Sequence, residues 1–158
     1  MENLSHSAQD YLEAILILSQ EKGQTRVKDV AEHLGVKKPS VVVAIKSLAE
    51  KGLVNHEHYG YVELTEEGER VAQQIYHRHQ VLTKFLNKIL GLSPELAEQD
   101  ACQMEHYISP QTLERFVKFV EFVENFPTTG QDPKWLTYFK RYVETGEPPP
   151  CREEKASE

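Results

Sequence analysis

The stretch that most restricts the fold is residues 25–64, where two short helical patterns precede two short strand patterns. The first helical pattern spans residues 25–34, and the second runs from Pro39 to Gly52. Two short helices joined by a tight turn that contains glycine are typical of a helix-turn-helix. The strand patterns that follow, around Tyr59-Gly60, are typical of a hairpin. Together they predict a winged helix-turn-helix.

Basic side chains gather on this stretch, although the whole chain of 158 residues has a formal net charge of -7. Between Lys22 and Lys51, seven bases stand against three acids, which leaves four excess positive charges. Local charge decides whether nucleic acid can bind, so the pattern predicts binding to double-stranded DNA. The candidate DNA-binding residues are Arg26, Lys28, Lys37, Lys38, Pro39, Ser40, Val43 and Lys46.

The bases in that set are expected mostly to contact phosphates, which positions a protein without reading sequence. Pro39, Ser40 and Val43 are expected nearer the bases, through hydroxyl hydrogen bonds and contact with thymine methyl groups. Val42 and Val43 stand where polar side chains are common, so readout is expected to depend on DNA shape.

The rest of the chain reads as mostly α-helical. A capping box at residues 7–10 predicts the start of a first helix that ends at Gly23. Further helices are predicted from Thr65 to about Leu90, from Ser93 to Ser109, from Pro110 to Phe126 and from Pro133 to Val143. The sixth helix, from Pro110, is either ordinary core or a subunit interface. The predicted divisions are a winged helix-turn-helix domain (1–72), a second helical domain (73–144) and a disordered tail (145–158).

The segment Asp100-Ala101-Cys102-Gln103-Met104-Glu105-His106 carries the densest group of metal-binding side chains. On a helix, Cys102, Glu105 and His106 fall at i, i+3 and i+4, so a thiolate, a carboxylate and an imidazole share one face. That combination is a ligand set. The competing interpretation is that Glu105 and His106 are solvated and Cys102 is a small buried hydrophobe.

Three more candidates lie elsewhere in the sequence. His79 falls on the apolar stripe of the long helix, where an imidazole is either a hydrogen-bonded core residue or a ligand. Asp10 and Glu13 share one face of the first helix at i and i+3. The competing interpretation is that Asp10 caps that helix and Glu13 is solvated.

Taken together, these motifs resemble the diphtheria-toxin-repressor and manganese-regulator family of metal-activated transcriptional repressors. The resemblance rests on Asp10-Tyr11-Leu12-Glu13, the winged helix, His77-Arg78-His79 and the segment from Asp100 to His106. It implies a homodimer in which the N-terminal DNA-binding domain and the helical dimerisation domain share a divalent metal site. The chain is expected to be a short form, which departs from the many iron-branch members that append an SH3-like domain.

The resemblance implies ligand roles residue by residue. Asp10, Cys102, Glu105 and His106 match the ligands of one site, and His79 matches a ligand of a neighbouring site. Glu13 matches a ligand of the manganese branch, and Glu98 an ancillary ligand of the iron branch. Thr83 stands where the iron branch has a glutamate ligand.

The expected ion is Fe(II) first and Mn(II) second, with other divalent transition metals able to bind in vitro. A thiolate such as that of Cys102 favours softer ions, whereas Mn(II) prefers a shell dominated by oxygen.

Several other classes of protein are disfavoured. The sequence lacks an apolar run long enough to span a membrane and lacks a signal peptide at Met1, so a cytoplasmic protein is expected. Its two cysteines, Cys102 and Cys151, are expected to be thiols. A zinc hydrolase with Glu105 as its base is disfavoured because no His-Glu-x-x-His pattern occurs. The main alternative is a metal-independent winged-helix regulator that binds a small molecule.

Overall fold

The computed structural model describes residues 4–56, 60–126 and 132–149. The chain divides into two compact units, Met1–Gln80 and Val81–Glu158, and each is described by itself below. The described residues leave out the tip of the predicted wing at 57–59 and the segment 127–131. They also leave out the end of the predicted tail at 150–158, which contains Cys151. Helices dominate both units, which confirms the predicted fold class.

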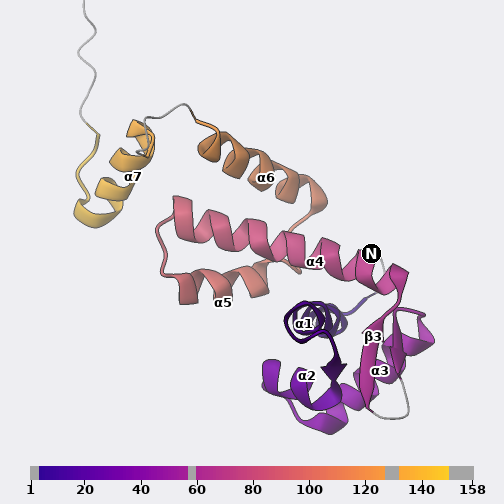
Figure 1. The fold of residues 1–158 in the computed structure, drawn as a ribbon. Coiled ribbons are helices and arrows are strands. Elements are labelled where there is room, and N and C mark those ends of the chain that lie inside the picture. The colour runs from indigo at the N-terminus through magenta and orange to yellow at the C-terminus, as the bar shows by residue number, and fades with distance from the viewer. Residues whose placement is uncertain (1–3, 57–59, 127–131, 150–158) are drawn as a thin grey trace, which may run out of the picture. The chain divides into compact units, whose positions relative to one another are not determined.

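The first unit is a winged helix-turn-helix with one helix before it (Figure 1). Its elements are, in order, α1 (His6–Lys22), β1 (Thr25–Arg26), α2 (Val27–His33), α3 (Lys38–Glu50), β2 (Val54–His56), β3 (Tyr61–Leu64) and the start of α4 (Glu66–Lys84). The core of this unit packs α1, α2 and α3 against the strands and α4, and Leu12, Ile15 and Ile45 are fully buried in it.

The N-cap of helix α1 lies two residues before the one that the predicted capping box gives. The Ser5 hydroxyl accepts a hydrogen bond from the Ala8 backbone N–H at 3.3 Å, so Ser5 and not Ser7 is the N-cap. Asp10 therefore lies inside the helix and does not cap it. The helix ends at Gly23, as predicted, because the chain there takes a φ of 74° that glycine adopts without strain.

Helices α2 and α3 confirm the predicted helix-turn-helix. Gly35 turns the chain between them with a φ of 64°. Pro39 lies in the first turn of α3, where the missing N–H has no helical partner to lose. The inner side of α3 is buried in the unit's core through Val41, Ile45 and Leu48. Its other side faces solvent.

The prediction of helix from residue 25 is wrong by two residues. Thr25 and Arg26 form strand β1, which pairs antiparallel with β3 through Thr25↔Val62 and Arg26↔Tyr61. The sheet order is β1-β3-β2, so the wing has a third strand. Thr25 lies on this edge strand but is only 1% exposed, because it packs against α1, where its hydroxyl donates to the Ile15 carbonyl at 3.5 Å.

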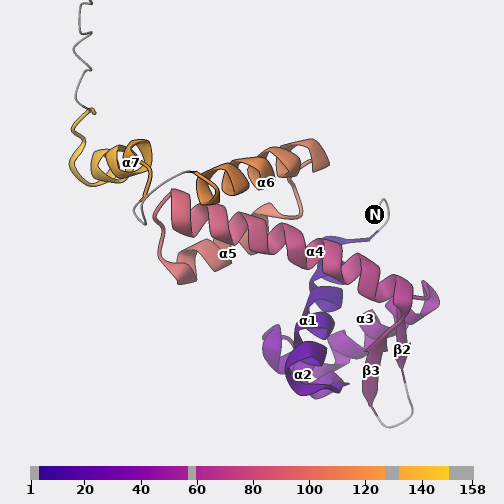
Figure 2. The ribbon, with the colours of Figure 1, turned by 45° about the horizontal axis from the view of Figure 1, so that its top comes forward.

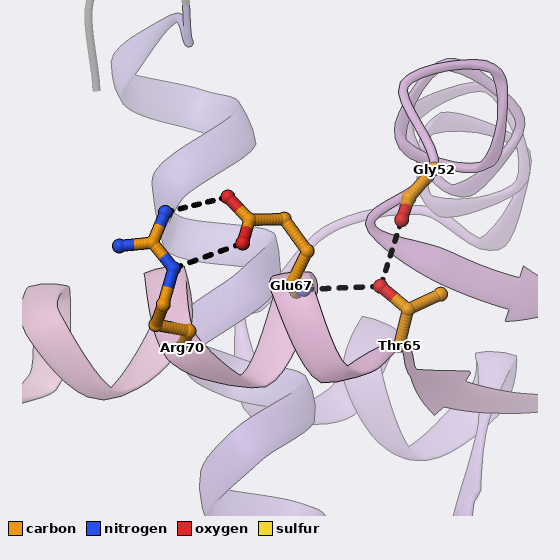
Figure 3. Close-up of polar contacts among 5 residues, drawn as sticks. Gly52, Thr65, Glu67 and Arg70 are labelled. Carbon is orange, nitrogen blue, oxygen red and sulfur yellow. Dashed lines mark hydrogen bonds and ion pairs between the residues drawn. The ribbon is translucent and has the colours of Figure 1, made fainter.

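The start of α4 is fastened to the end of α3. The Thr65 hydroxyl donates to the Gly52 carbonyl at 2.7 Å and accepts from the Gly68 N–H at 3.0 Å (Figure 3). Glu67 and Arg70 form a bidentate ion pair on the exposed side of the same turn. Gly68 lies so close to the preceding loop that a Cβ there would lie 1.8 Å from the Leu53 carbonyl oxygen. Only glycine fits at this point.

The regular elements in the described part of the second unit are all helices, joined by short connections. The end of α4 passes into a π-helix, η1 (Phe85–Ile89), and the remaining helices are α5 (Pro94–Met104), α6 (Pro110–Glu124) and α7 (Lys134–Thr145). Figures 1 and 2 show α5 and α6 on opposite sides of the end of α4. Ser93 and Ser109 cap α5 and α6, as predicted, by accepting from backbone N–H groups.

Apolar packing joins these helices in two clusters. Leu82, Leu86, Ala97 and Ala101 form one, and Ile89, Val120 and Leu136 form the other. Val120 of helix α6 is buried, which confirms a core role for this helix, while Phe122 is 51% exposed and a subunit interface there stays a prediction. No helix in the described part of the chain is long and apolar enough to cross a membrane.

Candidate metal centre and nucleic-acid interface

The first unit brings a carboxylate and an imidazole together. Glu13 of α1 and His79 of α4 are each 8% exposed. The Oε1 atom of Glu13 lies 4.0 Å from the Nδ1 atom of His79. Asp10 lies one turn before Glu13 on α1 and is half-buried. The interpretation of Glu13 as a solvated residue is therefore wrong. The apolar stripe of α4 does include His79, because Ile75 and Leu82 on either side are buried.

The second unit carries a similar pair. Glu105 is 1% exposed, and its Oε1 lies 3.7 Å from Nε2 of His106. Helix α5 ends at Met104, five residues before the predicted end, and Glu105 is its C-cap. The Glu105 N–H still donates to the Ala101 carbonyl at 3.0 Å, so the turn remains helical at this residue. The interpretation of Glu105 and His106 as solvated side chains is wrong.

Cys102 and Glu98 differ from these two residues in exposure. Both lie on α5 and both are exposed. The common edge predicted for Cys102, Glu105 and His106 is therefore not uniform, since it runs from an exposed thiol to a buried carboxylate. The interpretation of Cys102 as a buried hydrophobe is also wrong. Glu98 Oε2 accepts a hydrogen bond from the Thr83 hydroxyl at 3.4 Å.

The buried donors fit a divalent cation. Among the described residues, four polar or charged side chains are buried, and Glu13, His79 and Glu105 are three of them. Burying a carboxylate is costly unless charge of the opposite sign offsets it. Carboxylate oxygens and imidazole nitrogens are the donors that bind divalent first-row transition metals. Each unit therefore carries side chains of the kinds that suit a divalent cation.

All eight predicted DNA-binding residues are exposed in the first unit. On α3 the solvent side includes Val43, 70% exposed, and Val42, 47% exposed, beside Lys46. Large apolar side chains on a polar helix face suit contact with thymine methyl groups better than contact with water. This surface has the charge and the apolar groups of a DNA-reading helix.

The contact between Arg26 and Tyr61 was not predicted from the sequence. Arg26 donates a hydrogen bond from its guanidinium to the Tyr61 hydroxyl, and its Cζ lies 4.6 Å from the centroid of the Tyr61 ring. This hydrogen bond, more than the neighbouring Asp29 carboxylate, raises the pKa of Arg26 above its ordinary value. Only the pairing of β1 with β3 brings the two residues together, and β1 was predicted as helix.

A surface depression beside the start of α4 holds none of the predicted metal donors. It has a volume of about 660 Å³ and is lined by Gly52, Thr65, Glu66, Glu67, Glu69, Arg70 and Gln73. Four of these side chains are charged. An apolar small molecule would find little to bind there.

Two family models match the chain. One, described as the iron dependent repressor N-terminal DNA binding domain, matches residues 3–62. The other, described as the iron dependent repressor metal binding and dimerisation domain, matches residues 65–134. The two matches follow one another almost without a gap.

Named relatives match most of the chain. The transcriptional regulator MntR of Escherichia coli O6:H1 is 44% identical over 112 residues, which are 71% of this chain and 72% of that protein. The HTH-type transcriptional regulator MntR of Bacillus subtilis is 32% identical over 128 residues, covering 81% of this chain and 89% of that one. A solved structure described as a manganese-dependent transcriptional repressor in complex with manganese is 34% identical, with a TM-score of 0.65. The match covers 80% of this chain but only 61% of that one, less than two thirds of its length.

Proposed function

This chain belongs to the diphtheria-toxin-repressor and manganese-regulator family of metal-dependent transcriptional repressors, and from that premise we propose that it binds its operator as a homodimer once Mn(II) or Fe(II) is bound. The family consists of transcriptional regulators and not of enzymes, which removes the zinc-hydrolase interpretation. We further propose that the controlled genes serve metal homeostasis and that the protein acts in the cytoplasm.

The burial of Glu13, His79 and Glu105 carries the proposal. In our proposal Asp10, Glu13 and His79 from the first unit and Glu105 and His106 from the second hold the ion. A bound divalent cation supplies the positive charge that offsets the repulsion among these carboxylates. Because its donors come from both units, binding favours one arrangement of the DNA-binding unit over others.

The choice between the two ions turns on Cys102. The preference for Fe(II) assumed a thiolate ligand, but Cys102 is exposed while the buried donors are carboxylates and imidazoles. Such a shell suits Mn(II) as well as Fe(II). A solved relative is described as manganese-dependent, which adds support for Mn(II). We therefore propose the two ions as alternative activators and place neither first.

On the DNA side we propose that α3 enters the major groove. Lys37, Lys38 and Lys46 would contact phosphates, with Arg26 and Lys28 at the start of α2. Pro39, Ser40 and Val43 would face the base edges. In a homodimer two such helices can read half-sites one helical turn, about 34 Å, apart.

A metal titration followed by DNA binding tests this function. An operator would first be selected from a random DNA pool in anaerobic buffer with Mn(II). We expect Mn(II) or Fe(II) to raise the affinity for that operator by at least about fivefold over EDTA, which is the lower end of typical allosteric coupling. Equal affinities in EDTA and in metal would reject the switch.

The same titration of Cys102→Ala tests whether the thiol is a metal ligand, on which the preference for Fe(II) over Mn(II) depends. If the thiol is a ligand, the variant should lose response to Fe(II) and Co(II) more than to Mn(II), because a thiolate favours softer ions. If the shell is made only of carboxylates and imidazoles, all responses stay as in the unaltered protein. The Zn(II) response should follow that of Fe(II).

A further inference from the structure

We propose that Tyr61 is a positioning residue for DNA binding, whose neutral phenol holds the Arg26 guanidinium against the wing and leaves its full positive charge available to a DNA phosphate. This inference rests on the proposed function, because it assigns Tyr61 a role in the DNA interface. Tyr61 would act only through Arg26.

The backbone sets the pair in place. Strands β1 and β3 put Arg26 directly opposite Tyr61, and the Val27 N–H donates to the Gly60 carbonyl at 3.2 Å just beyond them. The guanidinium then meets the phenol twice, by a hydrogen bond to the hydroxyl and by approach of Cζ to 4.6 Å from the ring centroid. Two contacts from one side chain restrict the rotamers of a long arginine that is otherwise exposed.

The Asp29 carboxylate favours the charge of Arg26 only through space and does not hold its guanidinium in an ion pair. No carboxylate among the described residues forms an ion pair with its guanidinium. Asp29, the acid of the same turn, accepts from the Arg26 backbone N–H at 3.2 Å and lies 3.6 Å from Nζ of Lys22. A carboxylate partner would have to be displaced before a phosphate could bind, whereas a phenol would not. Arginine held in advance by a neutral group also loses less rotamer entropy on binding.

The test measures affinity for a mixed-sequence DNA duplex across a series of salt concentrations, with Mn(II) present. A phosphate contact needs no particular sequence, so this probe suffices. Arg26→Gln should reduce the slope of log affinity against log salt by about 0.9, the value for one phosphate contact. Tyr61→Phe should weaken binding about three- to tenfold, as expected for the typical net contribution of one hydrogen bond.

The double variant shows whether Tyr61 acts through Arg26. In the Arg26→Gln background, Tyr61→Phe should have no further effect, while in a Lys28→Gln background it should keep its full effect. Arg26→Lys is a second test of the same contact, and it leaves Tyr61 unaltered. It keeps the charge and thus the salt slope, but it lacks the planar fork and should lose about as much affinity as Tyr61→Phe.

The outcomes separate the two proposals. If the unaltered protein binds the duplex but Tyr61→Phe binds equally well, or weakens binding equally in the Arg26→Gln background, the role of Tyr61 is overturned and DNA binding stands. If the unaltered protein does not bind duplex DNA at all, the proposed function fails and this inference fails with it.

Discussion

Glu13 and His79 meet inside the first unit, where each residue is only 8% exposed. Asp10 and Glu13 were open to a structural interpretation as a cap and a solvated acid, and both interpretations fail because the helix begins at His6 and Glu13 is buried. His79 was recognised from the 3.6-residue period of its helix. The period could not tell whether its imidazole meets another side chain. The 4.0 Å approach to Glu13 answers that within the first unit.

Replacing one of the buried side chains proposed as ligands should weaken metal binding without unfolding the protein. We expect Glu13→Gln to weaken Mn(II) binding by about tenfold or more, because one anionic ligand becomes neutral while its shape is kept. Isothermal titration with Mn(II) measures the loss. The matched control is Glu21→Gln, an exposed acid on the same helix, which should bind Mn(II) as the unaltered protein does. An unchanged Mn(II) affinity in Glu13→Gln would exclude Glu13 as a ligand.

At the scale of the element, serine and glycine signals located most of the helix ends. Ser93 and Ser109 cap α5 and α6 through their hydroxyls, and Gly23 ends α1 through its backbone conformation, so each signal acts on the nearest backbone groups. Strand β1 was missed. Two residues have no period of their own, and Thr25 is a strand residue only because Val62 of β3 lies opposite it.

The close approach at the start of α4 gives a prediction for Gly68→Ala. On helix propensity alone, alanine would stabilise α4 by about 1 kcal/mol. Here its Cβ would lie 1.8 Å from the Leu53 carbonyl oxygen, which also accepts the Thr65 N–H at 3.0 Å. We expect a net loss of about 1–3 kcal/mol of stability, as for other overpacked sites.

Urea unfolding of the metal-free protein measures that loss. Glu69→Ala, an exposed position one residue later, is the control and should change stability by less than about 0.5 kcal/mol. Should Gly68→Ala prove more stable than the unaltered protein, the tight contact with Leu53 would not exist in solution.

For the whole molecule, we expect bound metal to raise the affinity for operator DNA, and bound operator to raise the affinity for metal. Donors in both units would link an ion to the orientation of the DNA-binding unit, and linkage is reciprocal. The factor by which Mn(II) tightens operator binding must equal the factor by which operator tightens Mn(II) binding. Titrating Mn(II) with and without saturating operator measures the second factor. A mismatch would mean that metal acts on something other than DNA affinity, such as assembly of the dimer.

The sequence alone was enough to determine the mostly helical fold, the winged helix-turn-helix and the family, because helix period, caps and motif spacing are local properties of the chain. Only the tertiary structure decided which chemically suitable side chains are buried. Glu105 and Cys102 stand three residues apart on one helical turn, yet the carboxylate is buried and the thiol is exposed. Burial depends on what packs against a helix, and that packing comes from residues far away in the chain.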